Sequence, residues 1–108
     1  MVLDAYVRDV KQIIEKGFPV FCAGIRPLDS KGRGYMVDFD CPVECGGVEV
    51  RTGDLIFADY DGVVVVPHEA EEEVVARAVE KVRKENLTMR ELLAGHYLKD
   101  VYAKYGVL

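Results

Sequence analysis

An arginine followed at once by an aspartate, Arg8-Asp9, is the pair in this sequence whose chemistry is easiest to name. It stands where an apolar segment of strand type ends and a helical pattern begins, which is where ligands of α/β proteins commonly bind. A guanidinium matches the two oxygens of a carboxylate, and a neighbouring carboxylate can hold a hard divalent cation directly or through water. The structural alternative makes Asp9 a helix N-cap and Arg8 a surface charge.

Other residues with possible chemistry lack a partner at a recognisable spacing. His68 and His96 are predicted at exposed helix ends, and Asp61 belongs first of all to an Asp-Gly turn. Cys41 and Cys45 have a metal-like spacing, but no second Cys or His pair completes a tetrahedral site. We interpret both cysteines as small apolar residues on one face of a strand. Three cations near one loop could help to hold an acidic substrate from a neighbouring subunit: Arg26, Lys31 and Arg33.

The elements that would position Arg8 and Asp9 follow from apolar periodicity. Residues 1–7 have the pattern of a strand, residues 9–17 that of a short helix closed by Gly17, and residues 19–23 that of a second strand. A loop rich in turn formers is predicted over 27–34. The chain would therefore run from strand to helix to strand around the pair.

Further along, alternation and turn residues predict a region of short strands between residues 35 and 66. Gly46-Gly47 lies between two apolar arms and indicates a hairpin, and Asp61-Gly62 turns between strands over 55–58 and 63–66. After His68 the period becomes helical, which predicts a long helix and then short helices over 87–94, capped by Thr88, and 98–105. This order favours an α/β domain with helices on one side of a sheet.

Composition limits the classes of function. The 108 residues are half apolar and 31% charged, as in an ordinary globular domain, and fit one domain, or part of one, over 1–108. The net charge of -5 repels phosphate backbones, so direct nucleic-acid binding is not expected. Because the sequence has no bilayer-spanning apolar stretch and no secretory signal, we expect a cytoplasmic protein without membrane contact.

Seven short motifs, taken in order along the chain, resemble the signatures of the RraA-like family. Collinear matches over essentially the whole length are far more specific together than any one of them. They are VRDV at 7–10, GFPVF at 17–21, PVECGGV at 42–48, GDLIFAD at 53–59, DGVVVVP at 61–67, MRELLAG at 89–95 and YGVL at 105–108.

The resemblance implies a three-layer β/β/α fold of the swivelling type, in trimers or hexamers with the active site near a subunit boundary. The family's enzymes are class II aldolases that use a divalent metal. They cleave 4-hydroxy-4-methyl-2-oxoglutarate and related 2-oxo acids to pyruvate, and they decarboxylate oxaloacetate. Carried over by position, Arg8 would bind the substrate and polarise the developing enolate oxygen, and Asp9 would anchor Mg²⁺ or Mn²⁺. The expected protein is a metal-dependent lyase acting on a small 2-oxo acid.

Two departures from the aldolase motif keep other functions open. The acidic residue expected three positions after the pair is Gln12, and only seven residues precede Arg8, so the family's upstream glycine loop is not among them. We interpret the chain as the C-terminal portion of the domain, truncated at its N-terminus, with an apolar face that association would cover. The alternatives are a non-catalytic RraA-like regulator that binds an RNA-degradation enzyme, and an inactive fragment of the aldolase.

Overall fold

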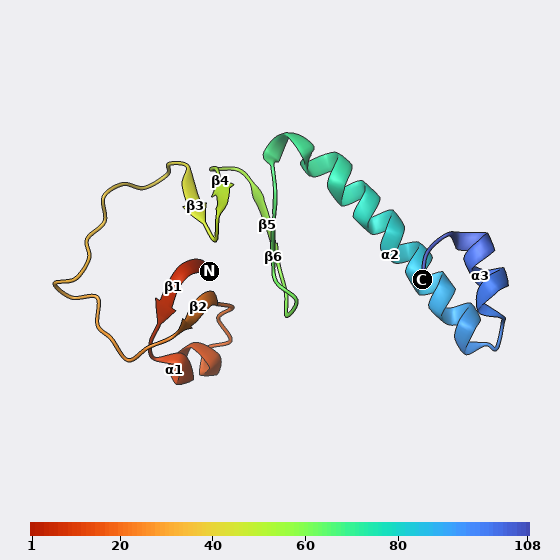
Figure 1. The fold of residues 1–108 in the computed structure, drawn as a ribbon, viewed down its shortest axis with the longest axis horizontal. Coiled ribbons are helices and arrows are strands. Elements are labelled where there is room, and N and C mark those ends of the chain that lie inside the picture. Colours follow the sequence, from red (N-terminus) through yellow and green to blue (C-terminus); the bar gives the residue numbers. More distant parts are fainter. The chain divides into compact units, whose positions relative to one another are not determined.

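The computed structural model describes all 108 residues, from Met1 to Leu108. It divides into two compact units, Met1–His68 and Glu69–Leu108. The first unit holds six short strands and one short helix, and the second is helical (Figure 1). This content confirms the mixed α/β class predicted from the sequence.

A β-α-β segment at the start of the first unit positions Arg8 and Asp9. Strand β1 (Val2–Val7) is followed by helix α1 (Val10–Glu15), and strand β2 (Phe21–Ile25) returns parallel to β1. Val7 pairs with Ile25, and the N–H of Arg26 donates to the carbonyl oxygen of Val7 at 2.9 Å. The two strands therefore end side by side. The second strand begins two residues later than predicted.

Two hairpins complete the strands of this unit. Strands β3 (Val43–Cys45) and β4 (Val48–Val50) are antiparallel, with Gly46 and Gly47 between them at φ 61° and 78°. Strands β5 (Leu55–Ala58) and β6 (Val63–Val66) form the second antiparallel pair. Both hairpins confirm the turn signals of the sequence. In the first, the two successive positive φ angles are readily adopted by glycine.

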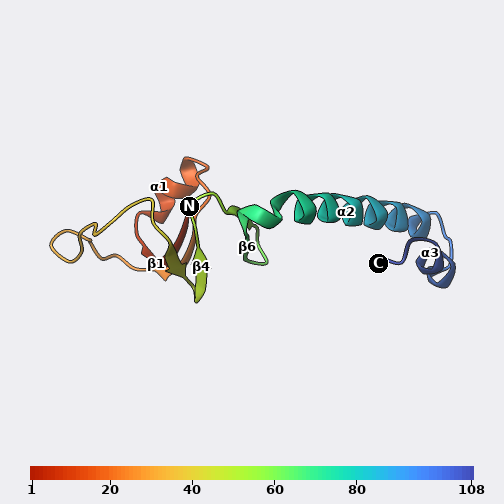
Figure 2. The same cartoon turned by 90° about the horizontal axis from the view of Figure 1, so that it is seen from above.

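The segment between β2 and β3 differs from the prediction. It contains no helix or strand. In both views it forms a long loop that extends away from the strands of its own unit (Figures 1 and 2). The alternation from Tyr35 to Phe39 does not form a strand, because no neighbouring strand accepts its backbone hydrogen bonds. Cys41 also lies outside any strand, so it does not share a strand face with Cys45.

The second unit holds two helices, α2 (Glu71–Leu93) and α3 (Leu98–Tyr105) (Figure 2). The 3-10 turn η1 (His68–Ala70) begins with the last residue of the first unit and leads into α2. The separate helix predicted over 87–94 is wrong, because this segment is the end of α2. No glycine or proline interrupts α2, and Gly95, at φ 90°, follows its last turn. Thr88 is therefore not a cap. It is 2% exposed, and its hydroxyl donates to the carbonyl oxygen of Val107 at 3.2 Å.

Few apolar side chains are fully enclosed, since Val66 and Val101 are the only buried hydrophobic residues. Instead, the first unit carries an open apolar trough of about 1140 Å³ between its strands. We call this hollow the apolar trough; its lining includes Val2, Val43, Val48, Ile56 and Val63. Water-exposed apolar surface on this scale is unfavourable, so the trough marks a surface that association would stabilise.

Candidate functional site at the ends of β1 and β2

Arg8 follows the last residue of β1 and lies between two carboxylates. Its Nε is 3.5 Å from Oδ2 of Asp9, and its Nη1 is 3.6 Å from Oδ2 of Asp29. All three side chains are about half exposed, which leaves guanidinium N–H groups available to a ligand. Asp29 belongs to the predicted loop. Its contact with Arg8 could not be predicted from any pattern in the sequence.

The pair borders a small hollow, which we call the arginine hollow. It has a volume of about 260 Å³ and is lined by residues of the β1 and β2 ends and of the segments that follow them: Arg8, Asp9, Val10, Ile25, Arg26 and Pro27. Arg8 and Asp9 therefore face a concave site in their own chain. Its volume suits a small organic acid rather than a large cofactor.

The backbone of Asp9 separates the two sequence interpretations of this residue. Asp9 occupies the N-cap position of α1, and its carbonyl oxygen accepts hydrogen bonds from the N–H groups of Gln12 and Ile13 at 3.0 and 3.2 Å. Its carboxylate, however, makes no capping hydrogen bond. The residue has φ 58° and ψ 34°, a left-handed conformation that aspartate tolerates better than most residues. The carboxylate thus takes no part in capping the helix and pairs with Arg8 instead.

A second arginine lies at the same edge. The guanidinium of Arg26 is 3.9 Å from the centre of the Tyr6 ring. The ring can lie against β2 because residue 24 is glycine, since a Cβ there would come within 2.8 Å of a Tyr6 ring carbon. The sequence suggested a role for Arg26 only towards a neighbouring subunit, yet Arg26 lines the hollow of its own chain, whereas Lys31 and Arg33 do not.

The other candidate ligands stay apart from this site. Cys22, Cys41 and Cys45 are all free cysteines, and His68 and His96 are exposed. Nowhere in the 108 residues do three or more His, Cys, Asp or Glu side chains gather as a metal cage. The oxygens that lie nearest to Arg8 are those of Asp9 and Asp29, so a cation bound here would have at most two protein carboxylates.

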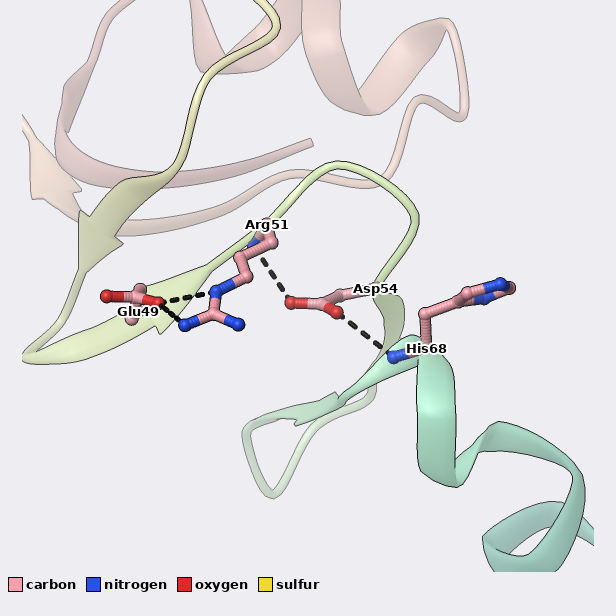
Figure 3. A network of polar contacts seen from close by, with 4 residues as sticks. All are labelled: Glu49, Arg51, Asp54 and His68. Carbon is pink, nitrogen blue, oxygen red and sulfur yellow. Dashed lines mark hydrogen bonds and ion pairs between the residues drawn. The ribbon is translucent and has the colours of Figure 1, made fainter.

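A polar network joins the turn after β4 to the start of η1 (Figure 3). The Asp54 carboxylate accepts hydrogen bonds from the N–H of Arg51 at 2.8 Å and from the N–H of His68 at 3.1 Å. The Arg51 guanidinium in turn contacts the Glu49 carboxylate at 2.6 Å. The N–H of Arg51, above all, holds the pKa of Asp54 below its usual value of 3.8. None of these residues lines either hollow, so we assign the network to stability.

Replacing Asp54 by asparagine is therefore expected to lower the melting temperature at pH 7. Because the native carboxyl has a lower pKa than the unfolded one, its stabilisation is present above about pH 4 and is lost as the pH falls through the native pKa. Thermal melts should show a deficit at pH 7 that shrinks towards pH 3. The matched control is Asp61→Asn, an exposed aspartate in the β5–β6 turn, which should leave both melts unchanged. An equal deficit at both pH values would contradict this assignment.

The family match covers the part of the chain that contains this site. Residues 1–65, which contain β1, α1, β2, the first hairpin and all but the last residue of the second, match the RraA-like family model, described as Aldolase/RraA. The chain belongs to the RraA-like family. The matched range includes every residue of the arginine hollow.

Two relatives show how far the similarity extends. A Halalkalibacterium halodurans protein, whose name proposes 4-hydroxy-4-methyl-2-oxoglutarate aldolase activity without establishing it, is 41% identical over 80 residues. This match covers 74% of the RraA-like chain and 38% of the relative. Protein DlpA of Legionella pneumophila is 35% identical over 104 residues, which cover 96% of this chain and 17% of DlpA. The chain thus spans less than half the length of either relative.

The fold is also that of a solved structure. The crystal structure of an uncharacterized protein from Pseudomonas syringae superposes with a TM-score of 0.83 at 28% identity, covering 89% of this chain and 48% of the other. The RraA-like fold expected from the sequence motifs is confirmed. No helix in the structure combines the length and the apolar character needed to cross a membrane.

Proposed function

We propose that this RraA-like chain carries the metal- and substrate-binding junction of a divalent-metal-dependent aldolase. The enzyme would cleave 4-hydroxy-4-methyl-2-oxoglutarate-type 2-oxo acids to pyruvate and would also decarboxylate oxaloacetate. The observation that supports this most is the arginine hollow, in which a half-exposed guanidinium and a carboxylate without a capping role lie side by side. The name of the Halalkalibacterium relative supports the aldolase part of this proposal.

Asp9 fits a magnesium or manganese ion as its anchor. Its carboxylate lines the hollow, is 59% exposed and makes no helix-capping hydrogen bond. Magnesium commonly binds through one or two carboxylates and keeps several waters, so it does not need a cage of protein ligands. When bound, such a metal supplies Lewis-acid stabilisation of the charge that develops on a 2-oxo oxygen.

Arg8 would orient the substrate and stabilise the same charge from the protein side. Its contacts with Asp9 and Asp29 orient the guanidinium of this lining residue before the ligand arrives. Donors fixed in advance stabilise a developing oxyanion without reorganising during the reaction. In oxaloacetate decarboxylation the bond to the departing carboxylate breaks, carbon dioxide leaves, and the electron pair passes to the 2-oxo oxygen, which Arg8 would contact; the resulting enolate then takes a proton from water at carbon to give pyruvate. This step needs no protein base, which makes oxaloacetate the sharper test substrate.

The test follows pyruvate release from oxaloacetate by the purified chain with Mg²⁺ or Mn²⁺. We expect turnover above a blank that contains the metal alone, and we expect EDTA to abolish it. The blank is essential because the free ions themselves act as Lewis acids. A rate equal to that of the blank, with the chain folded by circular dichroism, would refute the proposed activity.

A non-catalytic regulator is the second candidate, and one residue favours it. Gln12, exposed in the first turn of α1, replaces the acidic residue expected from the aldolase motif with a neutral amide. The net charge of -5 would suit a basic segment of an RNA-degradation enzyme. Salt-sensitive binding of such a segment, together with no turnover above the metal blank, would support this function over the first.

A further inference from the structure

We propose that Arg26 is a second carboxylate-binding residue of the arginine hollow, and that it makes the site select 2-oxo acids with a second carboxylate. The inference deepens the proposed function, on which it rests for the 2-oxo acid as ligand. It assigns to Arg26 a specificity-determining role within its own chain, separate from the role of Arg8.

The register of the parallel strands brings the two arginines together. Val7 of β1 pairs with Ile25 of β2, so the next residues, Arg8 and Arg26, occupy equivalent positions directly after the ends of adjacent strands. Adjacent strands are about 4.8 Å apart. Both arginines also line the arginine hollow, which places two cationic side chains around one small cavity.

The two guanidinium groups differ in their partners. Arg8 is within 3.6 Å of carboxylates on both Asp9 and Asp29, whereas Arg26 forms no ion pair with any carboxylate of the chain. Arg26 instead lies over the face of the Tyr6 ring. A ring face stabilises a cation but accepts none of its in-plane N–H donors, so these remain available to a planar anion.

This arrangement favours a ligand with two carboxylates. Like charges on neighbouring strand positions are unfavourable, and an anion that contacts both relieves the repulsion. The carboxylate next to the 2-oxo group would meet Arg8, with the 2-oxo oxygen towards Arg8 and the cation at Asp9, and the other carboxylate would meet Arg26. Tyr6 and Gly24 act as positioning residues, because the glycine admits the ring and the ring supports the Arg26 guanidinium.

The test compares two 2-oxo acids of equal length, 2-oxoglutarate and 2-oxopentanoate, which differ by one carboxylate. Their binding to the full chain with Mg²⁺ is measured by calorimetry and by the side-chain Nε–H signals of arginine. We expect 2-oxoglutarate to bind about ten-fold more tightly, since hydrogen bonds to charged groups contribute at this level. In Arg26→Gln the ratio should fall to about one through weaker binding of 2-oxoglutarate alone, and Arg26→Lys should retain part of it.

The matched control is Arg33→Gln, an exposed arginine of the same loop that does not line the hollow and should leave the ratio unchanged. Arg8→Gln should weaken both acids. Failure to bind either acid, equal binding of both by the unmodified chain, or an unchanged ratio in Arg26→Gln would overturn the inference. Binding requires no turnover. A selectivity lost in Arg26→Gln therefore supports the role of Arg26 even if the chain fails to decarboxylate oxaloacetate, which would refute only the proposed activity.

Discussion

Replacing Asp9 by asparagine is expected to reduce metal-dependent pyruvate release by at least about a hundred-fold, or about 3 kcal/mol, by analogy with the loss of one oxyanion-stabilising group. The amide would occupy the same space but would lose the negative charge that we propose to anchor the cation. The fold should persist, because asparagine also tolerates the left-handed backbone at this position. Asp9→Ala should abolish release as well, with an added cost in stability from the same backbone. Oxaloacetate decarboxylation and circular dichroism measure the two effects.

The structure offers a matched control for the Asp9 experiment. Asp40 is the other aspartate with a positive φ, at 54°, and it does not line the arginine hollow. Asp40→Asn therefore makes the same chemical change on the same kind of backbone, and it should leave pyruvate release unchanged. Chelator-sensitive decarboxylation that survives in Asp9→Asn would show that another group anchors the metal.

A charged residue introduced into the apolar trough is expected to prevent the chains from associating. The accessible surface of 9458 Å² exceeds the about 6,000 Å² typical of a folded monomer of 12.1 kDa, and also the about 7,000 Å² of two separate domains. The excess is of the size that obligate interfaces bury. We therefore expect a homo-oligomer, a trimer or hexamer, whose interface covers the trough, and we expect Val48→Asp to dissociate it.

Sedimentation velocity measures this effect. Val37→Asp is the matched control, because Val37 is 88% exposed in the segment between β2 and β3 and does not line the trough. It should leave the sedimentation coefficient of the oligomer unchanged. A stable, monodisperse monomer of the unmodified chain would contradict the expected assembly.

The position of the candidate site was predictable because it depends on local signals. A strand pattern, an Arg-Asp pair and a helical pattern follow one another within the first 17 residues, and the structure has β1, the pair and α1 in that order. The hairpin around Gly46-Gly47 was predictable for the same reason, since a tight turn is specified by the residues that form it. The catalytic roles of Arg8 and Asp9 remain predictions.

What the sequence could not specify depends on contacts between segments. Asp29 and Arg26 belong to a stretch without regular structure, and their approach to Arg8 follows from where the chain leaves β2. In the long helix α2, by contrast, a local pattern predicted a helix start that the structure does not have. Thr88 and Glu91 have the spacing of a capping box, but a helix that meets no glycine or proline continues through such a pattern.

The left-handed backbone at Asp9 restricts which residues can replace aspartate at this position during evolution. Among common residues, aspartate, asparagine and glycine adopt such angles most readily, and of these three only aspartate carries a charge. If Asp9 anchors a cation as proposed, a descendant would lose this anchor by one conservative change while its architecture survives. The identity of this single residue would then separate RraA-like chains that retain metal chemistry from those that keep only a scaffold for binding partners.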